Sequence, residues 1–340
     1  MLADDGTQGA AGVEPAARTG PRVTVVIPAK NEGRRIGRCL EALRGQSLLP
    51  AEIIVVDGHS TDDTVRVAAA YGAKILYETY GTRAGANQVG IEAAQGDFIA
   101  FTDGDCVPDP QWLETLASSF SGGVVGVGGR ILNEGDSFWQ QSIDVALDTV
   151  IGSANSVQGR PYLDRRFVSS ISGCNSMYRR SDLAAVGGFR TDLVTTEDTE
   201  LNRRLLARGR LLYVPDAIVR HRHERGLRDF GRRMIQYGHG RGQSLLLGPP
   251  FWASLSAPAI LVLTAFRPVL AVAAVLVYVG VLLASAVGPA IRLRRGALLV
   301  ALPVIFVIEH VGYAIGFWKG LLAARLPRAK RDAQAPGDSR

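Results

Sequence analysis

Short runs of β-branched and other apolar residues alternate with helical patterns through the first hundred residues of this 340-residue chain. The runs cover residues 22–27, 52–56, 73–77 and 97–102. Between them, segments 34–44, 61–71 and 83–94 repeat apolar residues at helical spacing. Strands that alternate with helices in this way are typical of a doubly wound α/β sheet with parallel strands. We therefore expect such a sheet to begin near residue 21.

Polar residues follow three of these expected strands directly. Pro28–Glu32 follows the first strand, Asp57 the second and Asp103 the fourth. The carboxyl ends of parallel strands lie at one edge of a sheet, and ligands bind in the crevice outside that edge. The pattern therefore predicts a ligand site built from these three clusters.

The fourth strand ends in Asp103-Gly104-Asp105. Two carboxylates separated by glycine can hold a hard divalent cation, Mg²⁺ or Mn²⁺, which prefers oxygen ligands and is often shared with substrate phosphates. Such a triplet alone is weak, since a surface turn explains most of them. Its place at a strand end, with Asp57 at another, favours a functional role.

A second acidic group, Glu197-Asp198, begins an expected helix. A threonine cap followed by acidic residues also suits a helix N-terminus without any function. A displacement reaction in which a hydroxyl attacks, however, needs a carboxylate that takes the proton of that hydroxyl. Asp198 is the candidate for this general base.

The strand pattern is weaker beyond residue 122. We expect a strand at 124–131, a helix at 137–156, a mobile loop at 158–172, helices at 181–186 and 199–208, and a late strand at 211–214.

The net charge of +6 is concentrated between Arg220 and Arg241, where seven arginines stand against two acidic residues. Apolar residues in this segment are spaced as on one face of a helix. A basic amphipathic helix of this kind suggests contact with anionic lipid headgroups or a phosphate-bearing acceptor. A solvated helix face explains the pattern equally well.

The segment from residue 249 to 325 is largely apolar. We expect three membrane segments, at about 250–266, 268–288 and 297–318, since a bilayer span needs roughly 20 apolar residues. Three arginines between the last two segments favour a cytoplasmic loop there. Three full crossings would place the basic tail outside, against the same rule, so the number of crossings and the side of the C-terminus stay open.

Residues 1–20 resemble neither a signal peptide nor a folded segment, so we expect a disordered tail and a cytoplasmic domain after it. Cys39, Cys106 and Cys174 are too few and too widely spaced for a disulfide framework, which fits a reducing compartment.

Five motifs together resemble the family 2 glycosyltransferases of the GT-A fold. They are VVIPAKNE, VVDGHSTDDT, AGANQVGIEAAQGDFIAFTDGDC, SGCNSMYRRSDLAAVGGF and TTEDTELNRRL, and the similarity extends from about Arg22 to Gly242. Within the family, the chain is most similar to the succinoglycan-biosynthesis glycosyltransferases, which carry membrane segments after a late Tyr-Gly pair.

The resemblance implies roles for individual residues. Nucleotide and donor binding is implied for Pro28, Ala29, Asn31, Glu32, Asp57, Arg83, Asn87, Asp103 and Asp105. Asp105 and Asp103 are implied as metal ligands. Some relatives use a late histidine as a further ligand, and His221 or His223 could serve here, although a histidine in an arginine-rich stretch is more often structural. Gly173, Cys174 and Asn175 correspond to a loop that faces the sugar and acceptor, Asp198 to the general base and Glu197 to its acidic neighbour.

Two positions depart from the family pattern. His59 replaces a residue that is commonly small, which leaves the nucleotide unspecified. Gln236–Arg241 has histidine and glycine where processive synthases carry arginine and tryptophan in Q-x-x-R-W, so a non-processive enzyme is expected.

The sequence therefore predicts an inverting, metal-dependent glycosyltransferase with a UDP- or GDP-linked donor and a lipid-linked or saccharide acceptor, located in the inner membrane as a multi-pass protein. Expected boundaries are a tail (1–20), a GT-A domain (21–220), a basic juxtamembrane segment (221–248), a membrane region (249–325) and a basic tail (326–340).

Two alternatives stay open: a polyprenyl-phosphate glycosyl synthase and a non-catalytic membrane scaffold. An oxidoreductase is disfavoured because no G-x-G-x-x-G follows the first strand. Nucleic-acid binding is disfavoured because the arginines lack interleaved aromatic residues.

Overall fold

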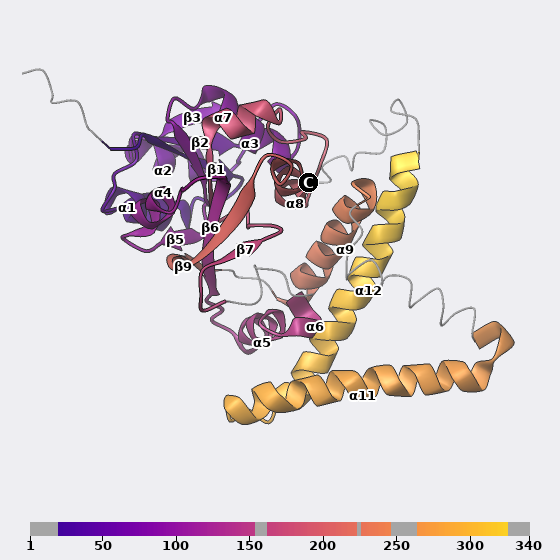
Figure 1. Cartoon of the computed structure of the whole chain (residues 1–340). Helices are drawn as coiled ribbons and strands as arrows, with labels where there is room; N and C mark the ends of the chain where they lie inside the picture. The colour runs from indigo at the N-terminus through magenta and orange to yellow at the C-terminus, as the bar shows by residue number, and fades with distance from the viewer. Residues whose placement is uncertain (1–19, 154–161, 223–225, 246–263, 326–340) are drawn as a thin grey trace, which may run out of the picture.

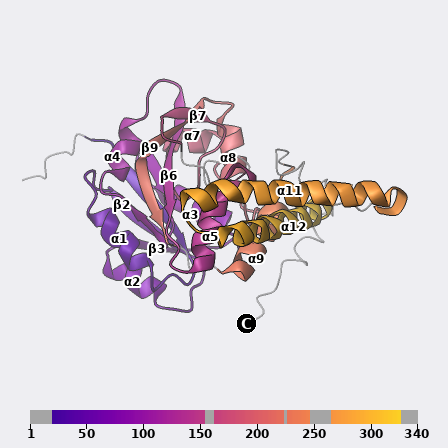
Figure 2. The ribbon, with the colours of Figure 1, turned by 90° about the horizontal axis from the view of Figure 1, so that it is seen from below.

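The computed structural model describes residues 20–153, 162–222, 226–245 and 264–325 (Figure 1). An α/β domain is followed by long helices that leave it on one side, as Figure 2 shows for α11 and α12. The strands are β1 (Val23–Ala29), β2 (Glu52–Asp57), β3 (Lys74–Tyr77), β4 (Phe98–Phe101), β5 (Cys106–Pro108), β6 (Val124–Asn133), β7 (Arg166–Val168), β8 (Ser176–Arg179) and β9 (Arg210–His221). The helices are α1 (Ile36–Arg44), α2 (Thr64–Ala70), α3 (Arg83–Ala93), α4 (Trp112–Ser118), α5 (Phe138–Leu147), α6 (Val150–Ser153), α7 (Arg180–Ala185), α8 (Glu197–Leu205), α9 (Leu227–Gln243), α11 (Pro268–Arg292) and α12 (Leu298–Arg325).

The described strands form one mixed sheet in the order β3-β2-β1-β4-β8-β6-β9-β5, with β7 paired to β9. Strands β1 to β4 are parallel, as the sequence predicts. Strand β8 then runs antiparallel to both β4 and β6. The α/β prediction is confirmed, with a sheet that is mixed rather than parallel throughout.

Helices cover both faces of the sheet. Because side chains alternate across a strand, Val23, Val25 and Ile27 of β1 face one core while Val26 faces the other. The first core includes the buried faces of α1 and α4, and the second those of α3 and α8. The two-sided burial explains why β1 and β2 are almost continuous apolar runs.

Strand β9 is longer than the expected 211–214, because it continues past a proline. The ladder with β6 pairs Gly129 with Val214 and then Arg130 with Ile218, so residues 215–217 bulge out of it. The bulge excludes Pro215 from the hydrogen-bonded ladder. A β carbon on Gly129 would lie 1.9 Å from the carbonyl oxygen of Ala217, so only glycine fits opposite the bulge.

Of the helix expected at 137–156, the described part forms two helices, α5 and α6, and residues 154–156 lie outside the described residues. Thr149 Oγ1 accepts a hydrogen bond from the Gly152 backbone nitrogen at 3.1 Å and so starts a new helix. Of the loop expected at 158–172, residues 158–161 lie outside the described residues, and 166–168 form β7.

Helices α9 and α12 lie side by side and touch through their backbones (Figure 1). A β carbon on Gly238 or Gly242 of α9 would lie 2.1 Å from a carbonyl oxygen of α12. A β carbon on Gly316 or Gly320 of α12 would lie 2.0 Å from a carbonyl oxygen of α9. We call these four residues the glycine seam. Small residues at such an interface let two helix backbones approach closely, as in membrane helix pairs.

Among the described residues, two helices are long and apolar enough to cross a membrane: Pro268–Arg292, with a mean hydropathy of 2.6 over its 18-residue window, and Leu298–Ala324, with 2.1. They correspond to the second and third segments expected from the sequence. The first expected segment, 250–266, lies almost entirely outside the described residues. Large apolar side chains on α11, such as Val269, Leu276 and Val277, are exposed in this structure.

Candidate active site

The ends of β1 and β2 form the first wall of the site. Ala29 pairs with Asp57, so the loops that follow leave the sheet side by side. The Asn31 backbone nitrogen donates to Ser60 Oγ at 2.9 Å, and Asn31 Oδ1 accepts from the Thr61 nitrogen at 2.9 Å. Asp57 is 1% exposed and accepts from the Ser60 nitrogen at 2.9 Å. The predicted nucleotide residues Pro28, Ala29, Asn31, Glu32 and Asp57 are thus brought together at one sheet edge.

Arg83, at the start of α3, joins two acidic groups that are far apart in the sequence. Its Nη2 contacts Asp103 Oδ1 at the end of β4, and its Nε lies 3.1 Å from Glu197 Oε1 at the start of α8. Burial alone would lower the pKa of Arg83, but the two carboxylates raise it well above its ordinary value. Arg83 is therefore a fixed positive charge between the two acidic motifs.

Glu197 is nearly inaccessible to solvent, at 6% exposed. Burial raises its pKa to about 7, Arg83 opposes this shift, and the neighbouring Asp198 adds to it.

Asp198 lies beside the loop before β8. Its Oδ2 accepts from the Gly173 nitrogen at 3.1 Å, and its Oδ1 accepts from the Thr199 nitrogen at 2.6 Å. Thr196, two residues before Asp198, has a φ of 61°. This left-handed conformation costs about 1–3 kcal/mol and needs support from its surroundings. Helix α9 provides the support, because the neighbouring Thr195 Oγ1 donates to the Gln236 carbonyl oxygen at 2.7 Å.

Asp105 and His221 form a third group. Strand β5 pairs Cys106 with His221, which places His221 Nε2 3.3 Å from Asp105 Oδ2. The other ring nitrogen, Nδ1, lies 3.1 Å from Asn133 Oδ1. An imidazole that holds a metal through one nitrogen and is oriented through the other has this arrangement. Asn133 was not foreseen from the sequence, because only the β6–β9 pairing brings it to the site.

A pocket of about 470 Å³ lies next to this group, between the α/β domain and α9. Its lining residues are Glu32, Arg35, Asp105, Asp229, Arg232, Arg233 and Gln236. Burial, followed by the charge of Asp105, raises the pKa of Glu32 to about 7, although Arg35 Nε lies 2.8 Å from Glu32 Oε2. The sequence indicated a basic α9 but not that Arg233 and Gln236 line a pocket.

Two predicted site residues have their side chains in the interior. Asn175 is fully buried: its Oδ1 accepts from Trp112 Nε1 at 2.8 Å, and its Nδ2 donates to the Arg130 and Ala217 carbonyl oxygens, both at 2.9 Å. Asn87 is 2% exposed, within α3. The structure does not bring either amide to the carboxylates described above.

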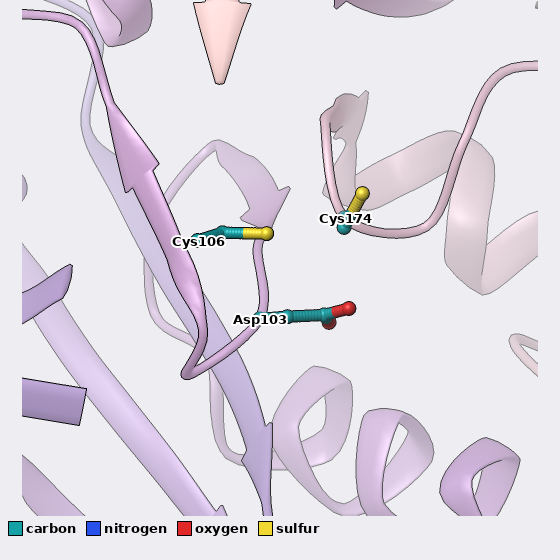
Figure 3. Close-up of side chains that lie close together, drawn as sticks. All are labelled: Asp103, Cys106 and Cys174. Atoms are coloured by element: carbon teal, nitrogen blue, oxygen red, sulfur yellow. The ribbon is translucent and has the colours of Figure 1, made fainter. Parts of the chain in front are cut away.

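Cys174 lies close to Asp103, and a residue not foreseen for the site, Cys106, lies beside both (Figure 3). One ligand atom from each of the three lies within 4.8 Å of the others. Burial raises the pKa of the Cys106 thiol well above its ordinary value, so this thiol is neutral at physiological pH.

Comparisons with known proteins agree with this architecture. Residues 24–187 match the model of the family described as "Glycosyl transferase family 2". The chain is 34% identical over 228 residues to the pre-mycofactocin glycosyltransferase of Mycobacterium tuberculosis, a match that covers 64% of this chain and 46% of that protein. This chain thus spans about half the length of that relative.

A second relative matches over nearly its whole length. It is the dolichyl N-acetyl-alpha-D-glucosaminyl phosphate 3-beta-D-2,3-diacetamido-2,3-dideoxy-beta-D-glucuronosyltransferase of Methanococcus voltae, 25% identical over 88% of this chain and 97% of that protein.

Among solved structures, the mannosyltransferase PcManGT of Pyrobaculum calidifontis, in complex with GDP-Man and Mn²⁺, has a TM-score of 0.54 at 20% identity, covering 90% of each chain. This likeness supports the GT-A fold.

Proposed function

Because the chain belongs to glycosyl transferase family 2, we propose that it transfers a sugar from a nucleotide-sugar donor to a lipid-linked or saccharide acceptor at a membrane surface. The Arg83 bridge is the observation that carries the proposal. It holds Asp103, at the donor edge of the sheet, next to the helix that begins with Glu197 and Asp198. Donor and acceptor groups of a single-displacement reaction have to meet at such a point.

The nucleotide, a uridine or guanosine diphosphate, binds along the wall formed by Pro28, Ala29, Asn31 and Asp57. The wall is preorganised because the loops after β1 and β2 hydrogen-bond to each other. Arg83, the fixed positive charge that contacts Asp103 after β4, binds the diphosphate.

Asp105, His221 and Asp103 would hold the divalent cation, Mg²⁺ or Mn²⁺. The donor set fits, because the Asp105 carboxylate and the His221 imidazole lie 3.3 Å apart, Asn133 orients the imidazole, and Asp103 stands two residues before Asp105. When bound, the cation neutralises the negative charge that develops on the departing diphosphate.

Asp198 acts as the general base. Its Oδ2 is held by the Gly173 nitrogen, so the carboxylate is oriented before the acceptor arrives. It takes the proton of the acceptor hydroxyl, which attacks the anomeric carbon on the side opposite the nucleotide and inverts its configuration. Glu197 and Arg83 position this helix start. Gly173 and Cys174 complete the sugar side, whereas the side chains of Asn87 and Asn175 are buried.

Helices α11 and α12 anchor the protein in the inner membrane, with residues 21–220 as a cytoplasmic catalytic domain, 221–248 as a basic segment at the headgroups and 249–325 as the membrane region. The exposed apolar surface of α11 supports this membrane anchoring, since such a surface is stable in lipid and not in water.

The relative from Methanococcus voltae, whose name describes a dolichyl phosphate-linked acceptor, supports a lipid-linked acceptor here. The absence of the Q-x-x-R-W motif from 236–241 supports a non-processive reaction.

The test is a screen of UDP- and GDP-sugars for nucleotide release that requires Mg²⁺ or Mn²⁺, with and without polyprenyl-linked acceptors. Asp198→Asn should lower transfer by about 10²–10⁴-fold, the usual contribution of a general base, and leave donor binding intact. Asp182→Asn, on the remote helix α7, is the control and should leave transfer unchanged. Turnover retained in Asp198→Asn would remove this residue from the base role, and no release with any donor would favour a non-catalytic scaffold.

A second candidate, a polyprenyl-phosphate glycosyl synthase, is favoured by one observation. Arg232 and Arg233 line the pocket beside Asp105, where the phosphate of a lipid acceptor could be bound. Transfer onto that phosphate converts a monoester into a diester and removes a negative charge from the lipid. Anion-exchange chromatography of the lipid product separates the two reactions.

A further inference from the structure

Two thiols and one carboxylate meet beside the proposed cation site. Asp103 follows β4, Cys106 begins β5, and Cys174 lies in the loop before β8. In Figure 3 the side chains of Asp103 and Cys106 extend side by side toward the loop that carries Cys174. A carboxylate oxygen and the two sulfur atoms all lie within 4.8 Å of one another.

This cluster adjoins the site of Asp105 and His221, since the Cys106 sulfur lies within 4.8 Å of ligand atoms of both groups, but its second thiol gives it a different ligand type. Thiolate sulfur selects soft and borderline cations, whereas Mg²⁺ and Mn²⁺ prefer oxygen. Two cysteines and one carboxylate make a three-ligand set for Zn²⁺ that leaves a fourth position open. We propose that Asp103, Cys106 and Cys174 form a binding site for a thiophilic divalent cation, Zn²⁺ or its analogue Cd²⁺.

Binding is a simple exchange: the two thiols lose their protons, and the two thiolates and one carboxylate bind one cation. Cys106 is fully buried, whereas Cys174 is partly exposed, so the cation enters from the Cys174 side. No oxidant or other reactant is needed.

The cation should inhibit sugar transfer, and this part alone rests on the proposed function. Asp103 Oδ1 contacts Arg83, so a cation bound to the same carboxylate competes with Arg83 for its negative charge. The Arg83 bridge between the donor edge and helix α8 is then weakened at one end. Asp103 is also a ligand expected for Mg²⁺ or Mn²⁺. The thiophilic cation therefore disturbs both groups proposed to bind the donor diphosphate, Arg83 and the Mg²⁺ or Mn²⁺ ion.

Binding is tested without any substrate, so its outcome is independent of the proposed function. The full-length protein in detergent, freed of metals and kept reduced, is titrated with Cd²⁺ while the ultraviolet charge-transfer band of cadmium thiolate is recorded. We expect a band that saturates at one Cd²⁺ per chain and persists in excess Mg²⁺. Cys106→Ser and Cys174→Ser should each abolish the saturating band.

Cys39→Ser is the matched control, because Cys39 is also fully buried but belongs to α1 and not to the cluster. It should keep the band. The proposal is overturned if the wild-type protein shows no saturable band, whether or not the variants fold, or if Cys39→Ser removes the band and Cys106→Ser does not. In a second measurement, Zn²⁺ should inhibit nucleotide release by the wild-type enzyme in excess Mn²⁺, and the inhibition, relative to each variant's own rate, should be lost in Cys106→Ser.

Discussion

Replacing Asn175 with alanine tests whether this residue supports the fold or binds sugar. The substitution removes three hydrogen bonds: a buried one from Trp112, a buried one to the Ala217 carbonyl oxygen and a part-buried one to the Arg130 carbonyl oxygen. Each partner left unsatisfied in the interior costs about 1–3 kcal/mol. Because neighbouring groups relax in part, we expect a total loss of about 3–5 kcal/mol, a large part of the roughly 5–15 kcal/mol that stabilises a typical domain.

The assay is thermal unfolding of the detergent-purified chain, followed by circular dichroism. At about 2–4 °C per kcal/mol for a domain of this size, Asn175→Ala should lower the Tm by roughly 6–20 °C. Ser118→Ala, which removes only an exposed hydroxyl bonded at 3.3 Å, is the control and should not change the Tm measurably. If Asn175→Ala melts with the wild-type protein but no longer binds donor or acceptor, the structural argument is refuted and Asn175 contacts the substrate.

Two further predictions concern the glycine seam and the buried Glu197. Gly316→Ala should lower the Tm, since its new β carbon would lie 2.0 Å from the Ile235 carbonyl oxygen and overpacking costs about 1–3 kcal/mol. Gly280→Ala on α11, with nothing within 4 Å of its β carbon, should leave the Tm unchanged or raise it; equal effects of both changes would contradict the seam. Because burial raises the pKa of Glu197 from 4.5 to about 7, the folded protein keeps a proton that the unfolded chain has released. The free energy of unfolding of the metal-free protein should therefore fall as the pH rises from about 4.5 to about 7. Glu197→Gln should lower this slope, leaving the part that Glu32 contributes, and the exposed Glu92→Gln should retain it in full; an identical slope in Glu197→Gln would contradict the prediction.

The first half of the fold could be predicted because its signals are local. Strands β1 to β4 are each an apolar run with its own boundary, and the polar residues after them necessarily meet at one sheet edge. The acidic start of α8 is a local signal in the same sense. These features give the α/β class and most of the candidate site.

The remainder depends on contacts between residues far apart in the sequence. Pro215 argues against a continuing strand, and only the bulge at 215–217 lets β9 extend to His221. The contact between Asp105 and His221 then follows from the antiparallel pairing of β5 with β9, which no local pattern encodes. Asn175 was assigned to the sugar loop by resemblance, whereas its three interior hydrogen bonds depend on α4, β6 and the bulge in β9.

The seam between α9 and α12 has a mechanical consequence. At the four seam positions no side chain separates the two helices. A shift of one residue along the axis would bring a side chain against the backbone that each glycine now contacts, so the helices resist sliding past each other. The α9 residues that line the pocket therefore keep a fixed position along the helix axis relative to α12. A substrate has to be long enough to reach them.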